Sequence, residues 1–535
     1  MNLKLNKSIK YLIFFVTVGL VLRLLYFHDL TFGYDQARDA LESISIIKNF
    51  DIKIIGPTTD IRGLFHSPLF WYIISPFYYF SGGNPEIARI PMILISLANI
   101  VFIYFFAKKL FKDEKIALLS SFFMAISFEA VQYARWLSNP PPALLTIGIF
   151  FYGLWLVVEK KKIGLPLMVL SWGFSVAFQF FLAYQIIFIF FGFGYLLITS
   201  RKTLIDSVKK YYWLYLATFI PLSFYILAQI KFKFIGLMSL LSHLTKNQGS
   251  SNSIFSYLIA FSNSLIEDAA TNFTFYNFSI ARWFLIIFSL AIIYLILKKK
   301  QLKIMIFLLV WFISPLIIYP IGNNDSYFLN IGILYPLIML TIFVFLELGK
   351  FVSLKHIQNL FLVIFIGLVI SSNLFLIITN NKGGEFLFSV QYKQNLNDEK
   401  KIVDYVYKSS KGKIFAFNTL TNPLYINTTW AYVFDWYGKN KYGFLPVWWG
   451  AYLDDFGKEI KFTQESKLNV GDKIFLIIEP LVFHEDYKQA YIRFENKRSK
   501  LVKRMQFGTH YIEERQIIKL KGFSRDEISK LLQVE

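Results

Sequence analysis

The sequence of 535 residues contains no cysteine. This absence excludes a disulfide framework, a thiol nucleophile and a cysteine-based metal site. Charged residues are scarce as well, at 17%, against roughly 25% in an average soluble domain. Apolar residues reach 55% and the mean hydropathy is +0.48. Apolar runs near the ~20 residues that a spanning helix needs recur through residues 1–379. The composition therefore predicts a polytopic, mainly α-helical membrane protein.

The net charge of +21 is placed in a way that argues against a nucleic-acid partner. Residues 380–535 carry 25 Lys and Arg against 19 Asp and Glu, and most of the excess lies in residues 1–379, with 31 against 16. There the cations form short clusters between apolar runs, which is the pattern of the positive-inside rule. The charge thus indicates membrane orientation and not a phosphate-binding face.

The cation clusters predict the orientation of the chain. They lie at the N-terminus and at 108–115, 159–162, 201–210, 298–303 and 350–355, and we assign all of them to the cytoplasm. About eleven spans alternate consistently with this assignment, at 9–28, 87–107, 116–132, 141–158, 163–182, 184–199, 211–230, 280–297, 304–320, 327–347 and 356–379. The N-terminus is then cytoplasmic, and everything after residue 380 is extracytoplasmic.

Two apolar runs need a separate interpretation. Residues 67–83 are short for a span and contain Pro68 and Pro76, so we expect an interfacial helix within a first external loop at 29–86. The run at 163–199 is too long for one span, and we expect it to break near 183–185. A second large external loop is predicted at 231–279.

After Thr379 the composition changes to ordinary charge density. The segments 413–419 and 473–483 have the pattern of strands, and 397–409 and 524–533 that of helices. We therefore predict a transmembrane domain at 1–379 and a small extracytoplasmic α/β domain at 380–535.

The stretch "FGYDQARDALESI" (32–44) follows the first predicted span directly. Asp35, Arg38, Asp39 and Glu42 are three and four residues apart, so one helix face carries all of them. One interpretation is that Asp35 caps a helix and Arg38 forms an ion pair. The other is a general base at the mouth of a cavity, beside an arginine that binds an anionic group.

Further polar residues interrupt apolar runs at the same predicted membrane face. Ionisable groups near lipid are expensive and tend to line a cavity. The candidates for substrate binding, besides Asp39, are His66, Asn139, Gln179, Gln185, Asp325 and Tyr327. Four arginines fall on the predicted external side, where the positive-inside rule disfavours cations, and binding of a phosphate would explain their presence. They are Arg38, Arg62, Arg89 and Arg135.

Several segments together resemble the GT-C glycosyltransferases. They are "GYDQARDA" (33–40), "IGP" (55–57), "LFHSPLFWYIISPFYYFSGGNP" (64–85), "ALLSSFFMAISFEAVQYARWLSNP" (117–140) and "SYFLNIGILYPLIML" (326–340). Within that superfamily the chain is most similar to the bacterial branch related to protein O-mannosyltransferases and to the aminoarabinose transferase of lipid A. The resemblance covers most of 1–379.

The resemblance implies an enzyme that takes a sugar from a polyprenyl-phosphate donor at the outer face of the membrane. Asp35 matches the first-loop aspartate of the family, which implies a catalytic base. The family's usual acidic pair is here Asp35-Gln36, its second-loop acid is Asn139, and a histidine expected after Gln179 is replaced by Phe180-Phe181. These departures leave a weak ligand set, so a divalent metal is not favoured. An inverting single displacement is the simplest reaction.

Other functions stay open at this point. A transporter or flippase for a lipid-linked glycan shares the cavity and the cations, although no inverted repeat is visible. A polymerase or ligase of surface polysaccharide is the other alternative. The sugar is not identified by the sequence, and a lipid, a glycan or a protein is possible as acceptor. The aromatic-rich segment 418–450 is either packed core or a carbohydrate-binding surface.

Overall fold

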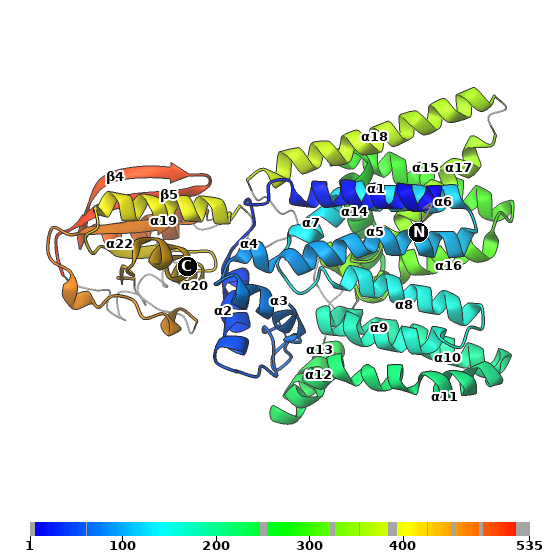
Figure 1. Cartoon of the computed structure of the whole chain (residues 1–535), viewed down its shortest axis with the longest axis horizontal. Coiled ribbons are helices and arrows are strands. Elements are labelled where there is room, and N and C mark those ends of the chain that lie inside the picture. Colours follow the sequence, from blue (N-terminus) through cyan, green and yellow to red (C-terminus); the bar gives the residue numbers. More distant parts are fainter. Residues whose placement is uncertain are drawn as a thin grey trace, which may run out of the picture. The chain divides into compact units, whose positions relative to one another are not determined.

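The computed structural model of the chain (Figure 1) describes residues 6–59, 61–246, 254–320, 327–351, 354–383, 393–424, 426–450, 456–480 and 485–520. The chain divides into two compact units that are not continuous in sequence. The first, called the helical unit below, comprises residues 1–25, 52–73 and 89–379. The second, called the α/β unit, comprises residues 26–51, 74–88 and 380–535. The first external loop predicted at 29–86 therefore contributes to both.

The helical unit is a bundle of apolar helices (Figure 1). Its described helices are α1 (Lys7–Leu24), α5 (Ile90–Phe111), α6 (Glu114–Ile126), α7 (Phe128–Arg135), α8 (Ala143–Val158), α9 (Gly164–Phe178), η1 (Phe180–Gln185), α10 (Ile186–Thr199), α11 (Arg201–Ala217), α12 (Phe219–Lys231), α13 (Ile235–Lys246), α14 (Ile254–Phe273), α15 (Phe278–Leu297), α16 (Leu302–Ile313), η3 (Ser314–Ile317), η4 (Tyr327–Asn330), α17 (Leu334–Gly349) and α18 (Lys355–Asn381). Helix α3 (Leu69–Phe80) crosses the division between the units.

Every predicted span coincides with one or two of these helices. By length and composition, four described helices are long and apolar enough to cross a membrane, or up to six if each bent pair is one span. Shorter apolar helices add to these, among them α8, α9 and α17. Helix α3 has 12 residues, and at 1.5 Å per residue this is about 18 Å, short of the ~30 Å hydrocarbon core.

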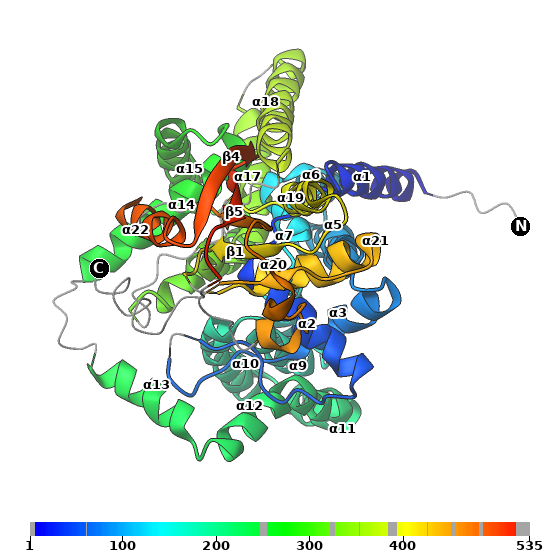
Figure 2. The same cartoon turned by 90° about the vertical axis from the view of Figure 1, so that its left-hand side faces the viewer.

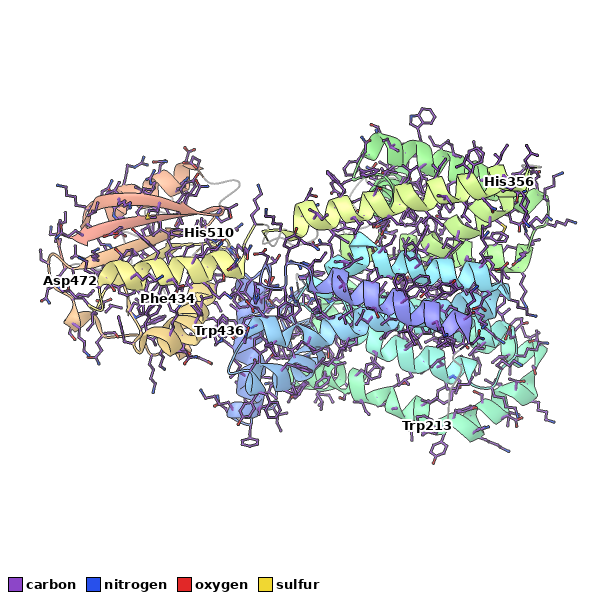
Figure 3. The ribbon with its side chains drawn as sticks, turned by 45° about the horizontal axis from the view of Figure 1, so that its top comes forward. Trp213, His356, Phe434, Trp436, Asp472 and His510 are labelled. Atoms are coloured by element: carbon purple, nitrogen blue, oxygen red, sulfur yellow. The ribbon has the colours of Figure 1, made fainter. Side chains whose placement is uncertain are left out.

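The outer surface of the helical unit is apolar, as a lipid-facing surface must be. Large side chains are exposed there, including Phe190, Trp213 and Trp283. Figure 3 shows Trp213 pointing away from the bundle. A soluble protein seldom exposes so large an apolar surface, so the surface agrees with insertion into a membrane.

The third predicted span is bent by 50° where α6 meets α7. Ser127 caps α7, because its Oγ accepts from the N–H of Ala130 at 3.1 Å, and the same hydroxyl donates to Asn272 Oδ1 at 2.7 Å. Asn272 also donates to the buried carboxylate of Glu129 at 2.8 Å. In an apolar bundle such freed polar groups need partners, and this network joins α7 to α14.

The run 163–199 is broken as predicted, but at Gln179 and not near 183–185. Helix α9 ends at Phe178, Gln179 is extended with φ −147°, and η1 leads to α10 from Ile186. The two glutamines lie on either side of η1, Gln179 before it and Gln185 at its end. Both amides are buried.

The α/β unit is built on a mixed five-stranded sheet with the order β2-β1-β3-β5-β4. Strands β1 and β3 pair in parallel, as do β1 and β2, whereas β5 pairs antiparallel with β3 and with β4. The elements are α2 (Tyr34–Lys48), α4 (Pro85–Ala88), α19 (Leu396–Ser410), β1 (Ala416–Leu420), α20 (Thr428–Val433), the π-helix η5 (Phe434–Lys439), α21 (Asn440–Tyr442), β2 (Val447–Trp448), η6 (Gly457–Glu459), η7 (Glu465–Lys467), β3 (Lys473–Ile478), α22 (Glu485–Glu495), β4 (Ser499–Phe507) and β5 (His510–Ile517).

Alternation along the buried strands places helices on both faces of the sheet. Leu476 and Ile478 of β3 pack in one cluster with Tyr487 and Tyr491 of α22. Phe475, the residue before Leu476, points to the other face and contacts Tyr405 of α19. Figure 2 accordingly shows α19 and α22 on opposite sides of β4 and β5.

Segments of the first loop are integral to the α/β unit. Residues 30–32 bond to the chain at the start of α19, with Leu396 N–H donating to Leu30 O at 2.9 Å. Glu86 of α4 accepts from Lys400 Nζ at 2.6 Å. The hydroxyl of Tyr432 in α20 donates to the carbonyl of Gly83. Helix α2, which carries Asp35, therefore folds with the C-terminal region.

The predicted C-terminal elements are partly present. The strands expected at 413–419 and 473–483 appear as β1 and β3, and the helix expected at 397–409 is α19. The helix expected at 524–533 lies outside the described residues. The sequence interpretation missed α22 and the hairpin of β4 and β5, whose outer strand is mostly exposed and polar.

Two glutamates are buried in the α/β unit, Glu399 on α19 and Glu479 directly after β3. Glu479 accepts from Trp430 Nε1 at 2.8 Å and Gln394 Nε2 at 2.6 Å, and burial raises its pKa to about 7. Glu399 is fully buried, and among the described residues neither of its oxygens has a hydrogen-bond partner. Burial raises the pKa of Glu399 well above its ordinary value, with Glu479 and Asp398 adding to the effect.

Glu399 gives a testable dependence of stability on pH. Its pKa is raised in the folded state, so the folded chain keeps a proton on Glu399 that the unfolded chain releases above about pH 4.5. The free energy of unfolding therefore falls as the pH rises through this range. Glutamine at position 399 cannot lose a proton, so the stability of Glu399→Gln relative to the wild type should rise between pH 5 and pH 8. Thermal unfolding of the full-length protein should show this rise, which is at most about 1.4 kcal/mol per pH unit.

The comparison of the two proteins cancels the pH dependence of other groups, including His510, whose pKa burial lowers to about 4. A difference in melting temperature that stays constant from pH 5 to pH 8 would contradict the assignment.

Candidate functional site

Helix α2 begins at the residues that the sequence singles out. Gly33 is its N-cap in an extended conformation, and Gly33 N–H donates to the side chain of Gln36 at 3.0 Å. Asp35 lies in the first turn, where a negative charge interacts favourably with the helix dipole. The interpretation of Asp35 as the helix cap is therefore wrong, because Gly33 occupies that position.

Arg38 is held between two carboxylates. Its Nη1 lies 2.7 Å from Asp35 Oδ1, and its Nε and Nη2 lie 3.1 and 2.9 Å from Asp39 Oδ1. Burial acts to lower the pKa of Arg38, but Asp39 and Asp35 outweigh it and raise the pKa above its ordinary value. The guanidinium is thus a permanent cation in a fixed position.

The two carboxylates differ in exposure. The side chain of Asp39 is 1% exposed and that of Arg38 12%, whereas that of Asp35 is 46% exposed. A buried charge must be paired, so Asp39 is committed to Arg38. Asp35 combines a fixed position with access from outside, which is what a group that exchanges protons with a substrate requires.

The other predicted arginines belong to the helical unit. Arg135 ends α7, and its Nη1 donates to Leu25 O at 2.7 Å. Arg89 is fully buried at the start of α5, and Arg62 is exposed. Two of the three are therefore cations withdrawn from water within the helical unit, whereas Arg62 is in contact with solvent.

Three predicted substrate-binding residues lie around one cavity in the helical unit. His66, Asn139 and Gln179, from separate segments, line a space of about 200 Å³. Aromatic walls are provided by Trp136, Phe180 and Phe181. An apolar cavity with a few convergent polar groups is typical of a ligand site.

The amides in this cavity differ in their partners. Asn139 Nδ2 donates to Phe178 O at 3.1 Å, which ties the segment between α7 and α8 to the end of α9. Gln179 is 2% exposed, and its Oε1 has no hydrogen-bond partner among the described residues. A buried acceptor without a hydrogen bond is costly. A bound molecule that donates a hydrogen bond to Gln179 Oε1 would remove this cost.

Of the remaining predicted residues, Gln185 is not brought to this cavity. Gln185 is fully buried and does not line it; neither end of its amide has a partner within the described part of the chain. Asp325 lies outside the described residues, and Tyr327 begins η4. Among the described residues, no group of three His, Cys, Asp or Glu side chains is placed to hold a metal ion.

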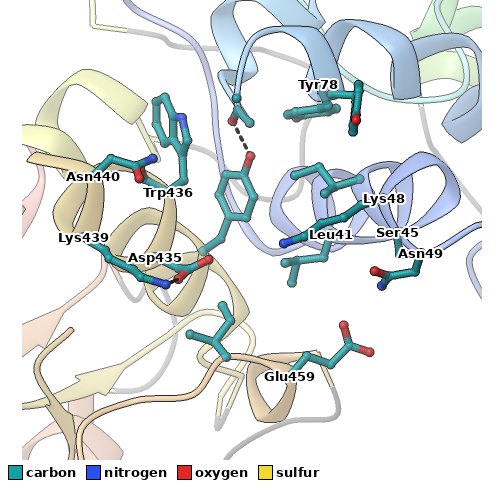
Figure 4. Close-up of a pocket in the computed structure, with 16 residues that line it drawn as sticks. Leu41, Ser45, Lys48, Asn49, Tyr78, Asp435, Trp436, Lys439, Asn440 and Glu459 are labelled. Carbon is teal, nitrogen blue, oxygen red and sulfur yellow. Dashed lines mark hydrogen bonds and ion pairs between the residues drawn. The ribbon is translucent and has the colours of Figure 1, made fainter. Parts of the chain in front are cut away.

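Sequence reasoning missed a second cavity, which lies in the α/β unit. It is lined by α2, by the turn after α3 and by the segment from Tyr432 to Asn440 (Figure 4). The aromatic density of 418–450 was the available signal. The pairing of that segment with α2 was not predictable, because the two are about 400 residues apart in the chain and only the fold joins them.

Comparisons with known proteins agree with this architecture. Residues 65–227 match the family model described as dolichyl-phosphate-mannose-protein mannosyltransferase. No curated protein matches the chain. The crystal structure of ArnT from Cupriavidus metallidurans in the apo state has a TM-score of 0.54 at 10% identity, over 97% of this chain and 100% of that chain. The same protein bound to undecaprenyl phosphate gives 0.54 at 11% identity, over 96% and 99%.

A third structure is similar over a smaller share of its own length. The Archaeoglobus fulgidus oligosaccharyltransferase tethered with an acceptor peptide has a TM-score of 0.51 at 13% identity, over 92% of this chain and 72% of that chain. The chain therefore has the fold of GT-C membrane glycosyltransferases. The predicted resemblance to that superfamily, and within it to the mannosyltransferase and aminoarabinose transferase branch, is confirmed.

Gln179 offers a test of the cavity that separates binding from structure. Replacing Gln179 by leucine removes an unsatisfied buried acceptor, so the stability of the protein should be unchanged or slightly higher. If the amide contacts substrate, KM for transfer should rise about two- to tenfold, the worth of one hydrogen bond.

Ser120→Ala is the matched control, because Ser120 is also buried with no hydrogen-bond partner among the described residues but does not line the cavity. Unchanged KM in Gln179→Leu, with both variants equally stable, would show that the amide does not contact substrate.

Proposed function

We propose that this chain is a membrane glycosyltransferase that moves a sugar from a polyprenyl-phosphate-linked donor to an acceptor hydroxyl, with Asp35 as the base. The observation that carries the proposal is the half-exposed Asp35 carboxylate, fixed by Arg38 at 2.7 Å in a chain that has the fold of ArnT. One ArnT structure holds undecaprenyl phosphate, which supports a polyprenyl phosphate as the carrier.

The proposed reaction is a single displacement with inversion. Asp35 takes the proton of the acceptor hydroxyl, and the oxygen of that hydroxyl forms a bond to the anomeric carbon. The bond between this carbon and the phosphate oxygen breaks, and the lipid phosphate leaves with the electron pair. A phosphate is a leaving group of low basicity, so it needs charge stabilisation and not a proton.

The cations proposed for the donor phosphate are Arg38, Arg62, Arg89 and Arg135. A planar guanidinium binds phosphate through two parallel hydrogen bonds. Asp39 fixes one of these cations, as its contacts with Arg38 Nε and Nη2 indicate. His66, Asn139 and Gln179 are proposed to bind substrate.

The proposed topology has eleven spans, a cytoplasmic N-terminus and an extracytoplasmic α/β unit. In this arrangement the lysine clusters remain inside, as the positive-inside rule requires. Asp35 and the C-terminal region then face the outer side of the membrane, where a lipid-linked donor presents its sugar.

Asp35→Asn tests the chemical step. Asparagine keeps the size of the side chain but cannot accept the proton, so transfer should fall by roughly 10²–10⁴. Binding of a radiolabelled polyprenyl-phosphate sugar should change little. The melting temperature should also change little, because a partly exposed ion pair contributes only about 0–1 kcal/mol.

Asp51→Asn is the control, since Asp51 is an exposed carboxylate of the same unit. Arg135→Lys provides the contrast, with loss of donor binding expected because the planar fork is lost. Near-normal turnover of Asp35→Asn would refute the assignment of Asp35 as the base.

The absence of cysteine makes the topology directly measurable. Val470→Cys places one thiol at an exposed position of the α/β unit, and Lys115→Cys places one in the 108–115 cluster. In intact cells a membrane-impermeant maleimide should label position 470, and should label position 115 only after the membrane is permeabilised. The cysteine-free parent gives the background, and the reverse labelling pattern would contradict the proposed orientation.

A further inference from the structure

A cavity of about 490 Å³ lies within the α/β unit (Figure 4). One wall is the C-terminal half of α2, and a second is the end of α3 with the turn that follows it. The third is formed by α20, η5 and α21. None of the polar residues considered so far for catalysis or substrate binding lines this space, so it needs its own explanation.

The wall formed by the C-terminal segment is held in place by specific contacts. The Tyr432 hydroxyl donates to Gly83 O, and the rings of Tyr432 and Trp436 stack at 6.1 Å with an interplanar angle of 22°. Asn440 Nδ2 donates to Trp436 O at 2.6 Å. Gly83 has φ +90°, and a Cβ there would lie 3.0 Å from Trp436 Cδ1. Trp436 is thus pre-positioned at the cavity.

Trp436 is itself part of a π-helix. Residues 434–439 adopt this rare conformation, which frequently marks functional sites. The widened turn places Asp435 and Trp436 together on the cavity wall, and Lys439 follows one turn later.

The charges around the cavity balance. Lys48 and Lys439 are the cations among the lining residues, and Asp435 and Glu459 are the anions. Figure 4 shows Lys48 facing Asp435 across the space. A strongly anionic ligand, such as a phosphate or a nucleic acid, would meet as many carboxylates as cations, so the site fits an uncharged polar ligand.

Aromatic surface accompanies these polar groups. Tyr79 is 48% exposed and Trp436 is partly exposed, so both offer ring faces. The hydroxyl of Tyr78 is buried and has no hydrogen-bond partner among the described residues. Aromatic faces pack against the C–H faces of a sugar ring, while carboxylates, amides and ammonium groups bond to its hydroxyls.

The position of the cavity along α2 connects it with Asp35. Ser45 and Lys48 line the cavity, and they follow Asp35 by ten and thirteen residues in the same helix. At 1.5 Å per residue this separation is roughly 15–20 Å. An extended ligand of a few sugar units spans such a distance.

We infer that this cavity binds a saccharide portion of the acceptor. The inference rests on the proposed transferase function and adds the substrate class to it: the acceptor is a glycan or carries one. In this arrangement Trp436 and Tyr79 stack on a sugar ring, Asp435, Glu459 and Lys48 bond to its hydroxyls, and α2 leads toward Asp35.

The test is direct binding without the donor. Purified full-length protein in lipid nanodiscs is applied to an array of immobilised oligosaccharides, neutral and acidic, and to a parallel array of peptides. We expect binding to neutral oligosaccharides and not to the peptides.

Two variants report on the cavity by different routes. Trp436→Ala removes the stacking face, and Asp435→Asn removes the charge of a carboxylate whose side chain is 41% exposed. Each should weaken oligosaccharide binding about tenfold, the worth of one good contact. Tyr511→Ala, an exposed aromatic of the same unit that does not line the cavity, is the control and should bind as the wild type does.

Binding of peptides alone, or no oligosaccharide binding by the wild type, overturns the inference. So does oligosaccharide binding that survives in both Trp436→Ala and Asp435→Asn while melting temperatures stay normal. These outcomes leave the transferase proposal standing, because that proposal is tested by turnover of Asp35→Asn and not by binding to this array.

Discussion

The ion pairs of Arg38 are the interaction on which the account depends. The guanidinium contacts a buried carboxylate, Asp39, and a half-exposed one, Asp35. Because a buried charge without a partner is strongly destabilising, Asp39 and Arg38 fix each other, and Asp35 is positioned by a cation that cannot lose its proton. One exposed carboxylate therefore keeps a constant place and charge on α2. A proton acceptor needs both properties.

Helix breaks create polar sites in the apolar bundle. Where a helix ends within the bundle, its backbone groups need partners, and polar side chains supply them. Ser127, Glu129 and Asn272 meet at the bend between α6 and α7. Gln179 lies where α9 gives way to η1, and it lines the cavity with His66 and Asn139. The apolar helices thus determine where polar chemistry is possible.

The sequence was informative where the signal is local. Apolar runs predicted the helices, and spacing put Asp35, Arg38 and Asp39 on one helix. The over-long run 163–199 indicated a break, although the break lies at Gln179 and not near 183–185. It was less informative where the signal is long-range. Nothing local indicates that α2 folds with β1, α19 and α20, since that grouping rests on contacts such as Leu396 N–H to Leu30 O. The cap at Gly33 was also missed, because glycine offers no side chain that marks it. Strand β4 was missed because most of its residues are exposed and lack the alternation of a half-buried strand. Strand β5 was missed because its buried positions include charged residues, Glu513, Glu514 and Arg515.

The central claim is the proposal that Asp35 is the catalytic base and that arginine side chains bind the phosphate of a lipid-phosphate sugar. It is tested most directly by a cryo-electron microscopy map of the Asp35→Asn protein loaded with its polyprenyl-phosphate sugar, since this variant should retain the donor unreacted. The account predicts density for the phosphate within hydrogen-bond distance of Arg38 or Arg135, with the sugar directed toward residue 35. Density that places the phosphate away from all four of Arg38, Arg62, Arg89 and Arg135, or the sugar away from α2, would contradict it.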